Sequence, residues 1–132
     1  MRRAFLDANV LFSAAWREEA GLVRLWHLPD CRLLTSPYAA EEARRNLLDA
    51  DRRRRLEELL AGVTVVPDVV GGELPNGVAL PEKDHPILLA AMRASATHLL
   101  TGDRQHFGPL YGRTVGGVTV LRPAEFLAQA ER

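Results

Sequence analysis

Short apolar runs alternate with longer segments of helical periodicity along this chain. The apolar runs, which are bounded by turn-forming residues, predict five strands, at residues 4–6, 32–35, 63–66, 98–101 and 118–121. The segments between them have apolar residues at helical spacing and predict helices at residues 10–28, 37–50, 52–61 and 86–96, with a short helix from residue 123. Because strands that alternate with helices generally form a parallel sheet covered by helices, the pattern predicts an α/β fold.

Polar and turn-forming residues mark several boundaries in this pattern. Ser36 is suited to cap the helix that begins at Pro37, and Gly62 is suited to end the helix at residues 52–61. Residues 67–83 contain three prolines and three glycines with little periodicity, so they predict a long loop. Loops of this length in a small domain are often lids or binding loops.

Length, composition and charge narrow the class of protein. A chain of 132 residues fits one domain, residues 1–132, and 47% apolar residues excludes wholesale disorder. The single cysteine, Cys31, cannot form an internal disulfide, so a reducing cytoplasm is the expected location. Asp7 and Asn9 interrupt the apolar N-terminal stretch, so neither a signal peptide nor a membrane span is expected. Zero net charge argues against a protein that coats nucleic acid generally, but not against an enzyme that holds it locally.

Four acidic residues lie at positions where the predicted topology can bring them together. Asp7 directly follows the first strand, and Asp103 lies two residues after the fourth. Glu42 lies in the first turns of the helix after the second strand, and Asp84 lies just before the helix that leads to the fourth. Right-handed crossovers place the carboxyl ends of parallel strands at one edge of the sheet, and ligands bind outside that edge. If the first and fourth strands are neighbours, the four acids converge on one crevice.

A cluster of carboxylates needs a counterion, because like charges in contact raise pKa values and destabilise the fold. Mg²⁺ and Mn²⁺ prefer oxygen ligands and bind through a few carboxylates together with substrate phosphates. Such an ion lowers the pKa of a bound water and stabilises charge on a phosphate, so no nucleophilic side chain is needed. The cluster therefore indicates metal-dependent chemistry at a phosphate.

Taken singly, each acid also has a purely structural explanation. Asp7 could cap a helix, and Glu42 could be one more solvated helical glutamate. Asp84 could favour the start of the following helix, and Asp103 could be a turn residue. Their combination, in this order around a parallel sheet, is more specific than any one of them.

The segments that contain these acids resemble the four acidic motifs of PIN domains. They are FLDANVL at residues 5–11, SPY at 36–38 leading to EARRNL at 42–47, KDHPIL at 83–88 and LLTGD at 99–103. The closing VTVLRPAEFL at 118–127 resembles the last strand and helix of that family. The resemblance therefore extends over residues 4–127, nearly the whole chain.

This resemblance implies a fold, an activity and partners. The fold would be a three-layer α/β/α sandwich with parallel strand order 3-2-1-4-5, in which the first and fourth strands are neighbours. The activity would be Mg²⁺- or Mn²⁺-dependent cleavage of RNA by a single PIN-like nuclease domain. Many small bacterial members, similar to VapC, are the toxins of toxin–antitoxin pairs, and homodimers are common in the family. An antitoxin protein and a second copy of the chain are thus expected partners, beside the RNA substrate.

The resemblance also assigns roles to residues of this chain. The residues that match the family's catalytic and metal-binding positions are Asp7, Glu42, Asp84 and Asp103, and those that match positions supporting the site by hydrogen bonds are Asn9 and Thr101. At the second motif Glu41 and Glu42 compete. Glu42 fits better because it stands five residues before Leu47, and Glu41 stays an alternative.

Several basic residues have two interpretations each. Arg104, beside Asp103, is the best arginine candidate for contact with a substrate phosphate, and a salt bridge to a neighbouring acid is an equal alternative. The arginines at residues 52–55 could contact RNA, but a solvated helix face is favoured. The histidines have no metal-ligand spacing; His85 and His106, which flank two of the acids, could contact RNA, but simple surface positions are favoured.

The aromatic residues have two possible places, and three other functions are compatible with parts of the sequence. Phe12, Trp16 and Trp26 suit either the core or a dimer interface. A non-catalytic PIN-like module that binds RNA or protein is the main alternative, although the presence of all four acids argues against it. A phosphatase with an aspartyl nucleophile would need a second acid where this chain has Asn9. A dinucleotide-binding domain would need a Gly-x-Gly-x-x-Gly segment after the first strand, and none is present.

Overall fold

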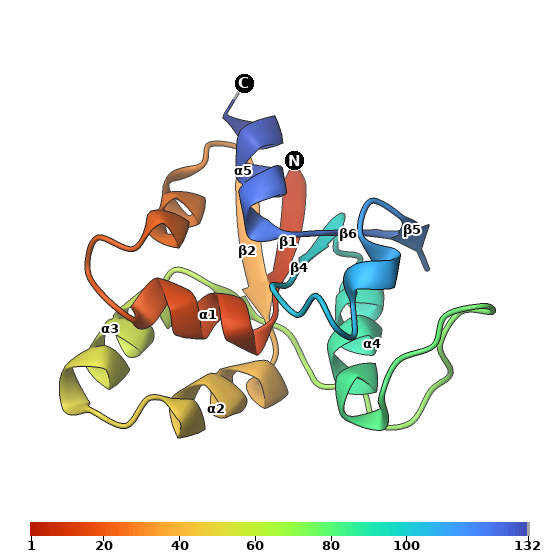
Figure 1. The fold of residues 1–132 in the computed structure, drawn as a ribbon, viewed down its shortest axis with the longest axis horizontal. Coiled ribbons are helices and arrows are strands. Elements are labelled where there is room, and N and C mark those ends of the chain that lie inside the picture. Colours follow the sequence, from red (N-terminus) through yellow and green to blue (C-terminus); the bar gives the residue numbers. More distant parts are fainter. Residues whose placement is uncertain (132) are drawn as a thin grey trace.

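The computed structural model describes residues 1–131, which form one mixed sheet with helices on both faces (Figure 1). The strands are β1 (Arg2–Leu6), β2 (Cys31–Thr35), β3 (Thr64–Val65), β4 (His98–Leu100), β5 (Thr114–Val115) and β6 (Val118–Leu121). The α-helices are α1 (Ala8–Ala15), α2 (Pro37–Asn46), α3 (Ala50–Leu60), α4 (His85–Arg93) and α5 (Pro123–Ala130). Short 3₁₀ helices are η1 (Gly21–His27), η2 (Glu82–Asp84) and η3 (Gly108–Leu110).

The strand order is β3-β2-β1-β4-β6-β5. All neighbours are parallel except β5 and β6, which form an antiparallel hairpin at one edge. The fifth strand predicted from the sequence is β6, so the predicted order 3-2-1-4-5 is confirmed, and β5 is an addition. Gly116 and Gly117 connect the hairpin with φ angles of +56° and +84°, a conformation that favours glycine.

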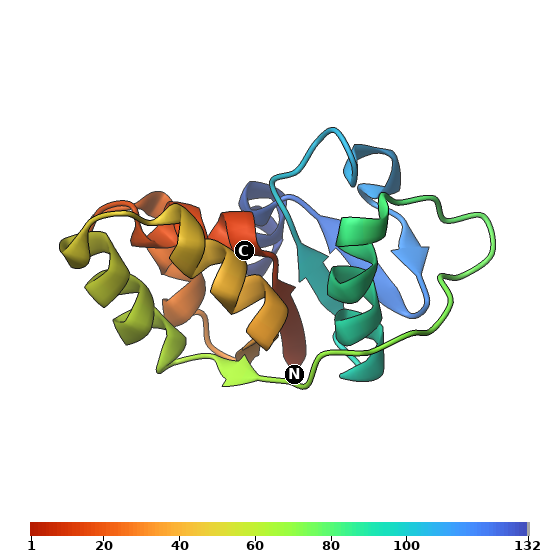
Figure 2. The same cartoon turned by 90° about the horizontal axis from the view of Figure 1, so that it is seen from below.

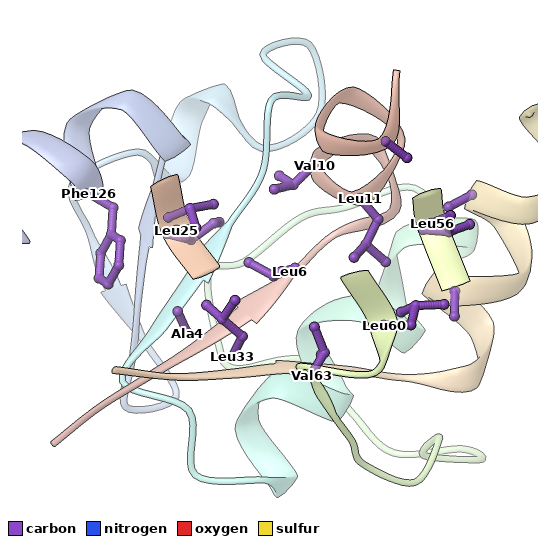
Figure 3. Packing of buried hydrophobic residues seen from close by; sticks show 14 of the residues in the cluster. Ala4, Leu6, Val10, Leu11, Leu25, Leu33, Leu56, Leu60, Val63 and Phe126 are labelled. Atoms are coloured by element: carbon purple, nitrogen blue, oxygen red, sulfur yellow. The ribbon is translucent and has the colours of Figure 1, made fainter. Parts of the chain in front are cut away.

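Alternate residues of the strands face opposite sides of the sheet and build two apolar cores. On one side, Leu6 and Leu33 pack with Leu11 of α1, Leu25 of η1 and Phe126 of α5 (Figure 3). The other side is covered by α4, and the core residues it shares with the sheet and with η3 are Phe5, Leu34, Leu99, Val120, Ile87, Leu88, Phe107 and Leu110. Figure 2 shows α1, α2 and α3 on one side and α4 on the other, which confirms the three-layer arrangement.

The predicted helix at residues 10–28 is wrong as a single element. Helix α1 ends at Ala15, the chain turns, and the 3₁₀ helix η1 follows. Two arginines of α3 stabilise this end: Arg55 Nε donates to the Ala15 carbonyl at 3.0 Å, and Arg52 Nε donates to the Trp16 carbonyl at 2.8 Å. These arginines donate to carbonyls that have no partner at a helix end. Because the donors come from α3, the residues around Ala15 alone do not predict where α1 ends.

The predicted helix at residues 37–50 is confirmed at its start and is shorter at its end. Ser36 Oγ accepts a hydrogen bond from the Ala39 N–H at 3.2 Å, and Pro37 is the first helical residue. The helix ends at Asn46 because the chain must turn into α3, whose first turn is capped by Asp49. Residues 67–81 contain no helix or strand, as the sequence predicted. Within residues 1–131 no helix combines the length and apolar character needed to cross a bilayer.

Candidate metal centre

A cleft of about 670 Å³ opens at the carboxyl ends of β1 and β4. In Figure 1 the first turns of α1, α2 and α4 gather below this edge of the sheet. The cleft is lined by Asp7, Ala8, Asn9, Phe12, Ser13, Glu42, Asn46, Lys83, Asp84, Gly102 and Asp103. The four acids singled out in the sequence, which come from four separate segments, therefore share one cleft.

Asp7 lies at the bottom of the cleft and is only 4% exposed. Its Oδ1 accepts a hydrogen bond from the Ala8 N–H at 2.7 Å, which also caps α1. Its Oδ2 accepts from Thr101 Oγ1 at 2.8 Å and from Asn9 Nδ2 at 3.1 Å. Burial nevertheless dominates: loss of hydration raises the pKa of Asp7 from its ordinary 3.8 to about 6, with smaller upward contributions from nearby Asp84 and Glu42.

Asn9 and Thr101 join β1 to the loop after β4. The Asn9 amide donates to Asp7 and, at 3.2 Å, to Thr101 Oγ1, while its Oδ1 accepts the Gly102 N–H at 2.7 Å. Thr101 Oγ1 also accepts the Asp103 N–H at 3.1 Å. A Cβ on Gly102 would lie 3.3 Å from Asn9 Oδ1, so a side chain there would press on this contact. The two residues hold the segments of Asp7 and Asp103 in a fixed relation.

The structure separates the two adjacent glutamates of α2. Glu42 lines the cleft and is partly buried, and its charge is felt by Asp7. Glu41 is exposed, and its Oε2 lies 3.8 Å from Arg44 Nη1. Ala39, Ala40 and Ala43 form the buried side of the helix, and this packing decides which glutamate faces the other acids.

Asp84 and Asp103 form the second half of the centre together with a histidine. His106 Nδ1 lies 2.8 Å from Asp103 Oδ2 and 3.3 Å from Asp84 Oδ2. Asp84 is 9% exposed, and its Oδ2 has no hydrogen-bond partner among residues 1–131. The Nδ1 contact does not satisfy this oxygen because one ring N–H serves one acceptor well, and Asp103 is closer. Desolvation raises the pKa of Asp84, opposed in part by Lys83 and His106.

These observations fit a hard divalent cation. The donors that line the cleft are mainly carboxylate and amide oxygens, the ligand types that Mg²⁺ and Mn²⁺ accept. A buried oxygen without a partner is costly, and a cation would relieve that cost at Asp84. The acids that line the cleft and could hold the ion are Asp7, Glu42, Asp84 and Asp103. Within residues 1–131, Asp84, Asp103 and His106 each offer one ligand atom within 4.8 Å of the others, and Asp7 and Glu42 are not in this closer group.

Other residues singled out in the sequence lie outside the cleft. Arg104 is exposed, makes none of the ion pairs found in residues 1–131 and does not line the cleft. Lys83 is the cation that does line it. Of the arginine run, Arg52 and Arg55 hold the end of α1, whereas Arg53 and Arg54 are exposed. Arg53 donates to the Leu47 carbonyl, and Arg54 pairs with Asp51 and Glu58.

The histidines and aromatic residues lie partly where the sequence predicts and partly elsewhere. His85 Nε2 contacts the Leu80 carbonyl at 2.9 Å, away from the acids, whereas His106 is part of the site and was missed. Its signal was its position three residues after Asp103, in the same turn. Phe12 lines the cleft, Trp16 is 44% exposed beside it, and Trp26 donates from Nε1 to the Leu59 carbonyl at 2.8 Å.

Solved structures share this fold. A PilT N-terminus domain protein from the hyperthermophilic archaeon Sulfolobus solfataricus is 17% identical, with a TM-score of 0.58 over 97% of this chain and 92% of that chain. VapBC2 from Rickettsia felis, bound to a DNA fragment from its promoter, matches at 11% identity and a TM-score of 0.60, over 91% of this chain and 98% of that chain. VapBC-1 from nontypeable Haemophilus influenzae matches at 16% identity and a TM-score of 0.58, over 92% of this chain and 98% of that chain.

No family model and no curated protein matches the sequence. At these identities the structural likeness establishes the fold: the chain has the architecture of PilT N-terminus (PIN) domains and of VapBC chains. The PIN-like fold predicted from the sequence motifs is thereby confirmed.

Proposed function

We propose that this chain is a ribonuclease that hydrolyses RNA phosphodiesters with a Mg²⁺ or Mn²⁺ ion held by Asp7, Glu42, Asp84 and Asp103. The observation that carries the proposal is the convergence of four acids from separate segments on one cleft, where Asp84 Oδ2 is buried without a partner in residues 1–131. The PIN fold supports it, because the acids occupy the motifs that resemble that family.

Different residues of the cleft would have different roles in hydrolysis. When bound, the ion lowers the pKa of a water molecule and offsets the charge of the phosphate. Three donors occupy most of the lone pairs of Asp7 and leave its carboxylate in one orientation. Lys83 adds a positive charge for a phosphate oxygen. The water oxygen bonds to phosphorus, a carboxylate of the cleft accepts the water's proton, and the bond to the leaving oxygen breaks as that oxygen takes up a proton.

The surroundings of the acids suit a polynucleotide strand. A second hollow of about 420 Å³, lined in part by Trp16, shares Phe12 and Ser13 with the main cleft. The two hollows therefore adjoin at Phe12 and Ser13, with the four acids in the first and Trp16 in the second. Nucleotides beside the cleaved phosphate would lie against these residues, where aromatic rings can stack on bases.

The proposal extends to partners. VapBC chains have this fold, and the sequence motifs are similar to VapC, so we propose that the chain is the toxin of a toxin–antitoxin pair in the cytoplasm. A homodimer is part of the same proposal. Light scattering on the purified chain, alone and co-expressed with the product of any adjacent small gene, tests both: we expect twice the monomer mass alone and a larger complex with the antitoxin.

A cleavage assay on total RNA with mapping of the new ends tests the activity. We expect cleavage with Mg²⁺ or Mn²⁺ and none with EDTA, and a loss of at least about 100-fold in Asp7→Asn and Asp103→Asn, the size expected when a group essential to metal catalysis is removed. Glu42→Gln should lose activity, whereas Glu41→Gln, one residue away on the exposed side, should not. RNA binding without cleavage under any metal condition would favour the non-catalytic module instead.

A further inference from the structure

The ring of His106 contacts two of the acids in the cleft. Its side chain is 24% exposed. The backbone N–H of His106 donates to Asp103 Oδ1 at 3.1 Å. This bond closes the turn, so the His106 ring lies beside the same carboxylate. Nδ1 then lies 2.8 Å from Asp103 Oδ2 and 3.3 Å from Asp84 Oδ2. One nitrogen therefore faces two carboxylates that come from different segments of the chain.

These separations match neighbouring ligands of one cation. Two adjacent ligands of an octahedral ion with bonds of about 2.1 Å lie about 3.0 Å apart. One ligand atom each from Asp84, Asp103 and His106 lie within 4.8 Å of one another, and the two contacts of Nδ1 are 2.8 Å and 3.3 Å. Asp84 Oδ2 lies 3.3 Å from Nδ1 but has no hydrogen-bond partner in residues 1–131, which is a second sign that a cation binds here, because a buried carboxylate oxygen without a hydrogen bond is costly.

We propose that His106 Nδ1 is a ligand of the catalytic cation and makes the site selective for Mn²⁺ over Mg²⁺. The inference rests on the proposed metal site and adds a nitrogen to its oxygen ligands. Imidazole is a good ligand for first-row transition metals, whereas Mg²⁺ prefers oxygen and surrenders water reluctantly. As a ligand, His106 would use the Nδ1 lone pair and would carry its ring hydrogen on Nε2.

The competing role for His106 is a hydrogen-bond donor only. In that role Nδ1–H would orient Asp103 and never bind the ion. The two roles differ in one observable: only a ligand places its nitrogen in the first coordination shell of the metal. They also differ in selectivity, because loss of a donor weakens all divalent ions alike, whereas loss of a nitrogen ligand weakens Mn²⁺ more.

Pulsed electron paramagnetic resonance of the Mn²⁺-loaded full chain tests the proposal directly. We expect modulation from one directly coordinated ¹⁴N, which changes frequency when the protein is labelled with ¹⁵N-histidine. The modulation should vanish in His106→Gln and persist in His85→Gln, a matched control whose ring contacts the Leu80 carbonyl. Calorimetry should show Mn²⁺ affinity reduced by about tenfold or more in His106→Gln, with Mg²⁺ affinity changed by less than about twofold.

The outcomes separate this proposal from the proposed function. Mn²⁺ bound without nitrogen modulation in the unsubstituted chain, or equal weakening of both ions in His106→Gln, overturns the ligand role. Absence of any bound Mn²⁺ overturns it as well. Nitrogen modulation in a chain that cleaves no RNA upholds the ligand and removes the ribonuclease. Because the unsubstituted chain alone gives the decisive spectrum, a variant that fails to fold does not block the test.

Discussion

Asp7 should lower the free energy of unfolding of the metal-free protein, and its replacement by asparagine should raise it. The pKa of Asp7 is raised from 3.8 to about 6 mainly by burial. At about 1.4 kcal/mol for each pH unit, holding this carboxylate ionised costs the folded state about 3 kcal/mol at pH 7.5. The neutral asparagine side chain removes that cost. It can keep the Thr101 bond but gives up one of the others, which costs about 1 kcal/mol.

The pH dependence gives the sign of this effect. Because the folded state binds the proton of Asp7 more tightly than the unfolded chain does, stability falls as the pH rises from 3.8 to about 6 and is level above. Asp7→Asn should therefore be more stable than the unsubstituted chain by about 2 kcal/mol at pH 7.5. The advantage should shrink by about 1.4 kcal/mol at pH 5.0, where the carboxyl of the unsubstituted chain takes up a proton.

Urea unfolding of both chains in EDTA at the two pH values measures the difference. Comparing the two chains cancels the titration of every other group that the substitution leaves alone. With Mn²⁺ at 100 times its Kd the unsubstituted chain should gain about 2.7 kcal/mol and the variant much less, so the order of stability should reverse. An Asp7→Asn chain that is less stable at pH 7.5 without metal, or an advantage that ignores pH, would refute the argument.

Three further predictions concern the support of the site and the end of α1. Asn9→Ala should weaken Mn²⁺ binding by about tenfold to 100-fold in calorimetry, because Asp7 and Gly102 lose a shared partner; unchanged affinity would contradict this. Arg55→Met should lower the free energy of unfolding by about 1–3 kcal/mol in urea without changing Mn²⁺ affinity, while Arg54→Met changes neither; equal effects would be a failure. Gly102→Ala should reduce kcat in the RNA assay while lowering Tm only slightly, since its Cβ presses on Asn9; a lower Tm with unchanged kcat would count against this prediction.

The sequence predicts the sheet and the positions of the acids well because both depend on local signals. Each of the five predicted strands contains a short apolar run, and Asp7 and Asp103 follow β1 and β4 closely. In a parallel sheet that placement determines the edge at which a residue emerges. The order of the strands came from the motifs and not from periodicity, since apolar runs alone do not specify which strands are neighbours.

The features that were missed depend on contacts between distant segments. The break after Ala15 requires arginines from α3, and two-residue strands such as β5 leave no periodic pattern. Glu42 was favoured over Glu41 only by its spacing to Leu47, and the physical reason that it lines the cleft is the packing of α2, because adjacent helical residues point about 100° apart. His106 is recognised as part of the site only when Asp84 arrives from another segment.

The sheet ends on both sides in a strand of two residues, β3 and β5. Such short edges expose few unpaired N–H and C=O groups, so another strand has little backbone on which to add. Short edges of this kind limit edge-to-edge aggregation. They also constrain self-association: two copies would meet through side-chain surfaces of their helices or loops, and a sheet continuous across both subunits is disfavoured.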